Sequence, residues 1–382
     1  MSAALTKSMV RGWCPDAWRP MMAGDGLLVR VRPPLGRLTR AQALGLSEAA
    51  ITHGNGQIDA TIRANLQIRG VREEHWRPLI DVLLDLDLID PDPTREARAN
   101  IMVAPEWTVG DDTCRIAQDL RARLGELPDL PSKAGFAIDA GAAPVLQDAP
   151  ADFRIERGTS SALILRADGR GLGMPLPRGT EVDHLIALAH WFVESGGAAS
   201  GRVARHDAAL PAWLSAAEAS AAPAARCGLG PHPFGTALGL PFGRIAAAAL
   251  TRLLETSDIG GIRVTPWHVV ILETQTPCSI DPRGFVVDPS SPILRADACV
   301  GAPACPQASV ETRNLAERLA PHVAGRLHVS GCAKGCARAA PADVTLTGRD
   351  GRYDLAFTAL AGAPPFRAGL DAAQILAYFG AA

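Results

Sequence analysis

The sequence predicts an α+β protein made of two related halves. Three short segments recur in the same order along the 382 residues, and the predicted strands and helices follow one plan in both halves. A stretch rich in alanine, serine and proline, 208–226, separates the two series. Ordered internal repeats of this kind indicate a duplicated structural unit. We therefore expect an architecture with pseudo-two-fold symmetry.

The recurring segments define the two halves. The matched pairs are RPPLGRLT (32–39) with GLPFGRIA (239–246), TIRANLQI (61–68) with GIRVTPWHVVI (261–271), and APADFRI (149–155) with APADVTL (340–346). One match of this length arises by chance, but three in the same order indicate duplication.

The first part of each half begins with a strand, such as GLLVRVRP (26–33). A helix is expected over 39–54, with Thr39 as its N-cap and Gly54 at its end. An alternating strand, 60–71, and a second helix near 75–86 follow. The second part of each half has a longer helix and further strands; the helices are expected at 111–127 and 309–324, and the strands at 325–332 and 342–348.

The alternating strand carries the first candidate site. Alternation along 60–71 places Arg63, Asn65, Gln67 and Arg69 on one face. A solvated surface strand and the wall of a polar ligand pocket both fit this pattern. The repeat favours the pocket, because its second copy carries Arg263 and Thr265.

Composition excludes several classes of partner. A formal net charge of −2 gives no overall field for nucleic acid. No run of eighteen apolar residues and no apolar leader segment is present, so we expect a cytoplasmic protein without a membrane partner. Nearly all the cations are arginines, which suit bidentate recognition of carboxylates.

Four of the eight cysteines form two close pairs. Cys299 and Cys305 are separated by five residues, and Cys332 and Cys336 by three. Four thiolates on turns hold either a tetrahedral zinc ion or an iron–sulfur cubane. The five-residue spacer disfavours zinc, and the flanking glycines and prolines disfavour ordinary buried cysteines. The other four, Cys14, Cys114, Cys227 and Cys278, are interpreted as structural.

This cysteine pattern, with HVSGC leading into the second pair, resembles the sulfite and nitrite reductase superfamily. In that superfamily the four cysteines bind a [4Fe-4S] cluster, and duplicated half-domains cradle siroheme. The resemblance implies a duplicated nitrite/sulfite reductase-like fold with ferredoxin-like half-domains and two α/β lobes. The implied units are a first half-domain (15–92), a first lobe without a cluster (93–205), a second half-domain (226–288) and a cluster-binding lobe (289–382).

Within the superfamily, the segment 11–39 and the modest chain length resemble the precorrin-3B synthase family. Only Lys133 stands where the reductases carry a pair of lysines. The resemblance implies an O2-dependent monooxygenase that hydroxylates precorrin-3A at C20 and forms a γ-lactone in aerobic cobalamin biosynthesis. A siroheme-dependent sulfite or nitrite reductase is the alternative, and a non-catalytic iron–sulfur electron carrier is a third reading.

The resemblance also implies cofactors and partners. The cluster would be held by Cys299, Cys305, Cys332 and Cys336. A mononuclear non-haem iron and siroheme are alternatives for the O2-activating group, and a ferredoxin or an NAD(P)H-dependent reductase would supply electrons. No catalytic residue and no iron ligand is assigned; His53, His268 and His328 are each interpreted as ordinary polar residues. The candidate residues for the carboxylates of the tetrapyrrole are Arg63, Asn65, Gln67, Arg69, Lys133, Arg263 and Thr265, with Arg37 and Arg244 as weaker candidates.

Overall fold

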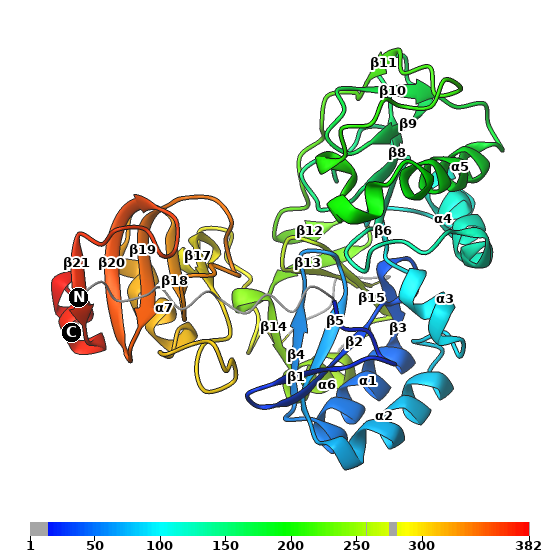
Figure 1. The fold of residues 1–382 in the computed structure, drawn as a ribbon. Coiled ribbons are helices and arrows are strands. Elements are labelled where there is room, and N and C mark those ends of the chain that lie inside the picture. Colours follow the sequence, from blue (N-terminus) through cyan, green and yellow to red (C-terminus); the bar gives the residue numbers. More distant parts are fainter. Residues whose placement is uncertain (1–13, 257, 275–280, 382) are drawn as a thin grey trace.

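The computed structural model describes residues 14–256, 258–274 and 281–381, and it confirms a mixed α+β protein (Figure 1). Among these residues no helix has the length and apolar character needed to cross a membrane. Cys278 lies outside the described residues.

The first half builds a five-stranded sheet covered by two helices. The strand order is β1-β2-β5-β4-β14. The strands are β1 (Met21–Ala23), β2 (Gly26–Val31), β4 (Gln57–Ala60), β5 (Leu66–Val71) and β14 (Arg244–Ala246), and the helices are α1 (Arg40–His53) and α2 (Glu73–Asp85).

The second half builds the matching sheet, in the order β12-β13-β16-β15-β3. Its strands are β12 (Gly230–His232), β13 (Gly235–Gly239), β15 (Gly261–Val264), β16 (Val269–Glu273) and β3 (Arg37–Thr39), and its helix is α6 (Ala247–Thr256).

The two sheets exchange an edge strand. Strand β3 of the first half pairs with β15, and β14 of the second half pairs with β4. Each exchanged strand follows a tight turn that has a residue at φ 52°, Leu35 in one copy and Phe242 in the other. Helices α1 and α6 pack together, and one hydrophobic core runs through both halves. The structure therefore confirms the pseudo-two-fold relation that the repeats predict.

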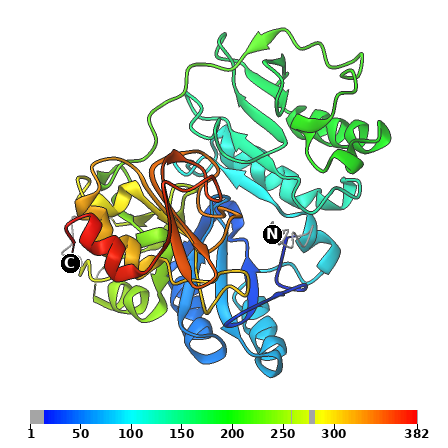
Figure 2. The ribbon, with the colours of Figure 1, turned by 60° about the vertical axis from the view of Figure 1, so that its left-hand side comes forward.

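Two α/β lobes flank this central pair of sheets (Figures 1 and 2). The first lobe has a six-stranded sheet, β11-β10-β9-β8-β7-β6, and the second a five-stranded sheet, β17-β18-β19-β20-β21. The first contains α3 (Pro93–Arg98), β6 (Ile101–Val103), α4 (Asp112–Ala122), β7 (Phe136–Asp139), β8 (Phe153–Arg157), β9 (Leu163–Ala167), β10 (Leu172–Pro175), α5 (Glu181–Glu194) and β11 (Glu218–Ala219). The second contains β17 (Ala296–Ala298), α7 (Arg313–Leu319), β18 (Leu327–Ser330), β19 (Ala342–Arg349), β20 (Arg352–Ala359), β21 (Arg367–Leu370) and α8 (Ala372–Tyr378).

The lobes repeat each other in register. Strands β6, β7 and β8 are parallel neighbours, as are β17, β18 and β19. The pairing sets Ile101 beside Phe136 in the first lobe and Ala296 beside Leu327 in the second. Because Phe153 and Val344 continue these rows, the structure aligns the lobes as the APAD segments do.

Several local predictions are confirmed. Helix α1 begins after Thr39, whose hydroxyl accepts from the Gln42 N–H while the Gln42 side chain accepts from the Thr39 N–H. The strand predicted at 26–33 is β2, and the helix near 75–86 is α2. The helix predicted at 309–324 is shorter: α7 ends at Leu319, two residues before Pro321, which cannot continue the hydrogen-bond ladder.

The continuous strand predicted over 60–71 is wrong. Strand β4 ends at Ala60, a turn follows, and β5 begins at Leu66. In the turn, Ala64 has φ 53°, and the Thr61 N–H donates to the Asn65 carbonyl at 2.8 Å. Polar and apolar residues alternate across a hairpin turn here, so a period of two does not establish one strand.

Candidate functional site

The four paired cysteines lie on two loops of the second lobe. Cys299 and Cys305 follow β17, and Cys332 and Cys336 follow β18. Burial raises the pKa of the Cys336 thiol; the charge of Lys334 lowers it, and the thiolates of the other three cysteines raise it further. Each of these thiols therefore lies within electrostatic range of Cys336, and none of them is in a disulfide.

Hydrogen bonds hold the cysteine loops. The Gly331 N–H donates to Cys299 Sγ at 3.2 Å, and the Thr312 hydroxyl to the Cys299 carbonyl at 2.5 Å. On the second loop, the Ser330 hydroxyl donates to the Cys332 carbonyl at 2.7 Å. The loops are thus fixed from the ends of the parallel strands.

A single metal ion and an iron–sulfur cluster require different placements of the thiols. Within the described residues no three His, Cys, Asp or Glu side chains converge as ligands of one ion. A four-iron cubane takes one thiolate at each iron, so its cysteines surround a volume rather than a point. The N–H donor to Cys299 Sγ is also of the kind that stabilises thiolate ligands.

The first half-domain contacts the loop that carries Cys299 and Cys305. The Gly24 N–H donates to the Ala304 carbonyl at 2.9 Å, and a Cβ on Gly24 would lie 2.2 Å from the Pro303 carbonyl oxygen. Arg69, which is 4% exposed, donates to Ala304 as well as to Asp25 and Asp59. Arg69 is therefore a buried link between sheet and loop, and it is not carried into the substrate site proposed below.

Beside this contact, Asp59 is surrounded by three arginines. It forms ion pairs with Arg244 at 3.0 Å, Arg313 at 3.2 Å and Arg69 at 3.4 Å. Burial works to raise the pKa of Asp59, but Arg313, Arg244 and Arg69 together hold it below its ordinary value. The group joins both half-domains to the second lobe.

The second half-domain has an equivalent group of ion pairs, in which the acid and one arginine have exchanged positions. Arg263 occupies the β15 position that Asp59 has in β4, and Glu273 takes the place of Arg69. Glu273 pairs with Arg263 and Arg37, both at 2.6 Å. Arg263 also donates to the Pro105 and Trp107 carbonyls, so it joins this half-domain to the first lobe.

This register corrects the match of Arg63 with Arg263 that the segments 61–68 and 261–271 suggest. Arg263 is equivalent to Asp59, and Trp267 is the equivalent of Arg63. Thr265 is fully buried and bonds only to its own turn, through the Val269 carbonyl and the Trp267 N–H. Arg263 and Thr265 therefore hold the fold, and the repeat no longer supports them as ligand residues.

Arg63 stands apart from these neutralised groups. It has no acidic partner within ion-pair distance in the described part of the chain, and its Nε is buried without a hydrogen bond. Its side chain donates to the Lys133 carbonyl at 3.4 Å, and the Cys14 thiol is a second hydrogen-bonding neighbour. Burial is the main cause that lowers the pKa of Arg63.

Arg30 is a residue that the sequence argument missed. It pairs across the sheet with Gln67, whose amide oxygen, suitably oriented, accepts from Arg30 at 2.8 Å. Burial, followed by Arg32, lowers the pKa of Arg30 to about 10, and Arg63 contributes in the same direction. Alternation along β2, with Val29 and Val31 in the core, was the available signal.

The histidines show no common site. His268 is equivalent to Ala64 and, like it, has positive φ; burial lowers its pKa. His328 is fully buried and neither ring nitrogen has a partner. His53 packs edge-on against His75 at 5.7 Å.

Comparisons with known proteins agree with this geometry. Residues 19–86 match the model of the nitrite/sulfite reductase ferredoxin-like half domain. A precorrin-3B synthase from Sinorhizobium sp is 31% identical, over 95% of this chain and 86% of that protein. A ferredoxin–nitrite reductase from Synechococcus elongatus is 26% identical, over 90% of this chain and 80% of that protein. The solved structure of the Mycobacterium tuberculosis NirA protein shares the fold, with a TM-score of 0.59 and 16% identity over 92% of this chain and 79% of that one.

Proposed function

Because the chain belongs to the precorrin-3B synthase family, we propose that it is an O2-dependent monooxygenase that converts precorrin-3A to precorrin-3B. The reaction hydroxylates C20 and closes a γ-lactone with a ring acetate. One oxygen atom of O2 enters the product and the other leaves as water, which consumes two electrons and two protons. The observation that carries the proposal is the four-cysteine group, in a chain related along almost its whole length to such an enzyme.

Cys299, Cys305, Cys332 and Cys336 would hold a [4Fe-4S] cluster. When bound, the cluster supplies single electrons to the reaction. The chain's own contribution is to fix the two cysteine loops, through the Gly331 N–H and the contacts of Gly24 and Arg69 with Ala304. The electrons would come from a ferredoxin or from an NAD(P)H-dependent reductase.

Arg30 and Arg63 are the proposed contacts for substrate carboxylates. A substrate with many carboxylates needs cations that are not already neutralised, because an unpaired buried charge is costly. These two guanidiniums lack acidic partners among the residues described, whereas Arg69 and Arg263 are saturated by Asp or Glu. Gln67 pairs with Arg30 across the sheet, Lys133 contacts Arg63 through its carbonyl, and Asn65 lies in the turn before β5; these three remain proposed neighbours of the substrate.

The test begins with protein purified without oxygen. About four irons and four acid-labile sulfides per chain, with a broad absorption shoulder, are expected for one cubane cluster. Addition of precorrin-3A, O2 and a reductant should then yield precorrin-3B. A cluster-loaded protein that leaves precorrin-3A unchanged under these conditions would contradict the proposal.

Arg63→Ala tests the substrate contact separately. We expect weaker binding of precorrin-3A by about tenfold, the loss of one charge-assisted contact, with an unchanged iron content. Arg72→Ala is the matched control, because Arg72 belongs to the same half-domain and its side chain is 69% exposed. Equal affinities of both variants and the parent would remove Arg63 from the site.

A siroheme-dependent nitrite or sulfite reductase is the second candidate. The 26% identity with a ferredoxin–nitrite reductase favours it. A sharp Soret band in the purified protein, with nitrite or sulfite accepting electrons, would establish this function in place of the first.

A further inference from the structure

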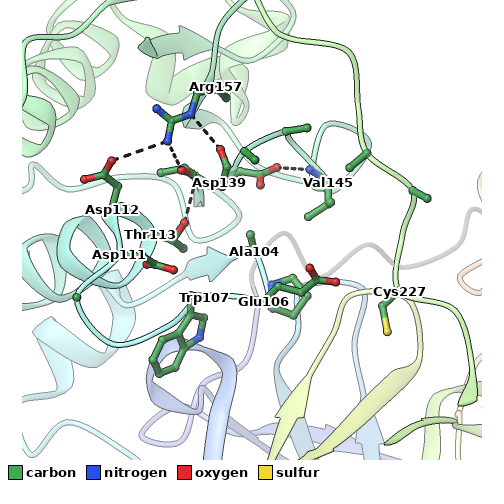
Figure 3. Close-up of a pocket in the computed structure, with 18 of the residues that line it drawn as sticks. Ala104, Glu106, Trp107, Asp111, Asp112, Thr113, Asp139, Val145, Arg157 and Cys227 are labelled. Atoms are coloured by element: carbon green, nitrogen blue, oxygen red, sulfur yellow. Dashed lines mark hydrogen bonds and ion pairs between the residues drawn. The ribbon is translucent and has the colours of Figure 1, made fainter. Parts of the chain in front are cut away.

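The first lobe contains a cavity at the position that the cysteine group occupies in the second lobe (Figure 3). Ala104 follows β6 as Cys299 follows β17. Asp139 ends β7 as Ser330 ends β18, and Gly141 and Cys332 each stand two residues further on. The cavity measures about 620 Å³, within the range of small-molecule sites.

The walls come from three parts of the chain. The first lobe supplies the ends of β6 and β7 and the beginning of α4, a helix of 11 residues. The second half-domain supplies Trp267, the equivalent of Arg63, and the connection between the halves supplies Cys227. Trp107 forms a further aromatic wall beneath Arg263, whose guanidinium lies 4.5 Å from its ring.

Asp139 is the residue whose environment indicates ligand binding. It is 1% exposed and lines the cavity. Its Oδ2 accepts from the Val145 and Leu146 N–H groups, both at 2.7 Å, whereas Oδ1 has no hydrogen-bond partner within the part of the chain that the structure describes. Figure 3 shows this carboxylate beside the turn that carries Val145. A buried carboxylate oxygen without a donor is costly to the folded protein, and a ligand that donates a hydrogen bond would satisfy it.

The charges favour a donor over an anion. The acids on the walls are Glu106, Asp111, Asp112 and Asp139, against Arg157 and Arg178. Arg157 donates to the carbonyls of Gly141 and Ala140, and Arg178 lies 3.5 Å from Asp112. Among the described residues that line the cavity, both arginines therefore have partners and the acids outnumber them, which disfavours a carboxylate or phosphate.

A metal or a cluster does not fit the same walls. Cys227 is the one thiol among them, and the described residues provide no set of three ligands for one ion. Burial, aided by Glu106, raises the pKa of Cys227 to about 11, so it carries no thiolate at neutral pH.

We propose that this cavity is a second ligand site, which takes a small flat organic molecule whose N–H groups are cationic or strongly donating. Asp139 accepts the N–H group through Oδ1. Trp107 and Trp267, which line the cavity, place aromatic rings beside the bound molecule. This site does not depend on the function proposed above.

Benzamidine is the probe, since its planar amidinium presents two N–H donors to a carboxylate. Titration calorimetry of the full chain should show saturable binding at one site, at least about tenfold tighter than benzoate, which has the same ring and the opposite charge. Fluorine NMR of protein containing 5-fluorotryptophan should show shifts of the Trp107 and Trp267 signals. Absence of saturable binding, or equal binding of benzoate, would overturn the proposal.

Two variants assign the contacts. Asp139→Asn keeps an oxygen for the Val145 and Leu146 N–H groups and should weaken benzamidine binding by at least about tenfold. Asp129→Asn, a 96% exposed control outside the cavity, should bind as the parent does. Trp267→Ala changes the wall that the second half-domain supplies. It provides the test of the binding site if Asp139→Asn does not fold. Unchanged affinity in the folded wall variants would refute the site.

Discussion

The two α/β lobes use one strand arrangement for two kinds of site. After corresponding strands, the second lobe presents Cys299 and Cys332, and the first presents Ala104 and Gly141. The second gathers four thiols, whereas the first leaves a cavity of about 620 Å³ lined by acids and tryptophans. The comparison teaches that the ends of parallel strands and the following loops supply a location, and that the loop side chains decide its chemistry.

Removal of one thiol gives the largest expected difference between the lobes. Cys332→Ser should abolish cluster assembly, because the cubane loses one of its four ligands. The control change, Cys227→Ser at the wall of the first lobe's cavity, should leave iron and sulfide content unaltered. Counting both elements in the two purified variants makes the comparison. Full cluster content in Cys332→Ser would mean that the cysteine group is not the cluster site.

The next largest effect is expected on stability, at the arginines Arg69 and Arg263 that differ in position between the two half-domains. Arg69→Met and Arg263→Met should each destabilise the protein by about 2 kcal/mol, since each removes one charged hydrogen-bond donor from acids that keep their other arginines. Of these two arginines, Arg69 is the one that donates to the cysteine loop, at the Ala304 carbonyl. Urea unfolding should therefore show similar losses, while iron content falls in the Arg69 variant alone. A fall in iron content in both variants would show that the effect is general loosening rather than loss of this link.

The buried carboxyl group of Asp139 should make the stability of the protein depend on pH. Burial raises its pKa to about 6, above the ordinary value of 3.8, so the native state keeps this proton over a range in which the unfolded state has released it. The contribution to stability is fully present below pH 3.8 and is lost as pH rises through about 6. At pH 7.5, Asp139→Asn should be more stable than the parent by about 2 kcal/mol.

Thermal unfolding of parent and variant from pH 4 to 8 makes this measurement. A buried acid retained at a cost in stability is typical of a binding site. Parallel curves for the two proteins across this range would mean that Asp139 does not hold its proton as described.

The smallest effect concerns the starts of α1 and α6. Thr39 caps α1, whereas Ala246 occupies the equivalent position before α6. Thr39→Ala should lower the free energy of unfolding by about 1 kcal/mol. Denaturant titration should show this loss without any change in iron content; no loss would mean that helix packing, rather than the cap, fixes α1.

Local signals in the sequence predicted much of this fold. Thr39 as N-cap located the start of α1, because a helix cap depends only on residues of one turn. The APAD segments gave the register of the two lobes correctly. The period-two signal over 60–71 failed, since alternation is compatible with a hairpin whose turn holds Ala64 at positive φ. Which arginines are free could not be predicted, because their partners are distant in sequence.

The sequence by itself determined the duplication, the order of the elements and the two pairs of cysteines, since each depends on residues near one another along the chain. The assembled fold was needed to show that Arg69 and Arg263 are paired with acids whereas Arg30 and Arg63 have no acidic partner among the described residues, and that the first lobe has a cavity at Asp139. Asp25 lies 44 residues from Arg69 and Glu273 lies 236 from Arg37. Ion pairs and cavities are made by strands that meet only when the sheets assemble, and their energies depend on burial that a local pattern does not contain.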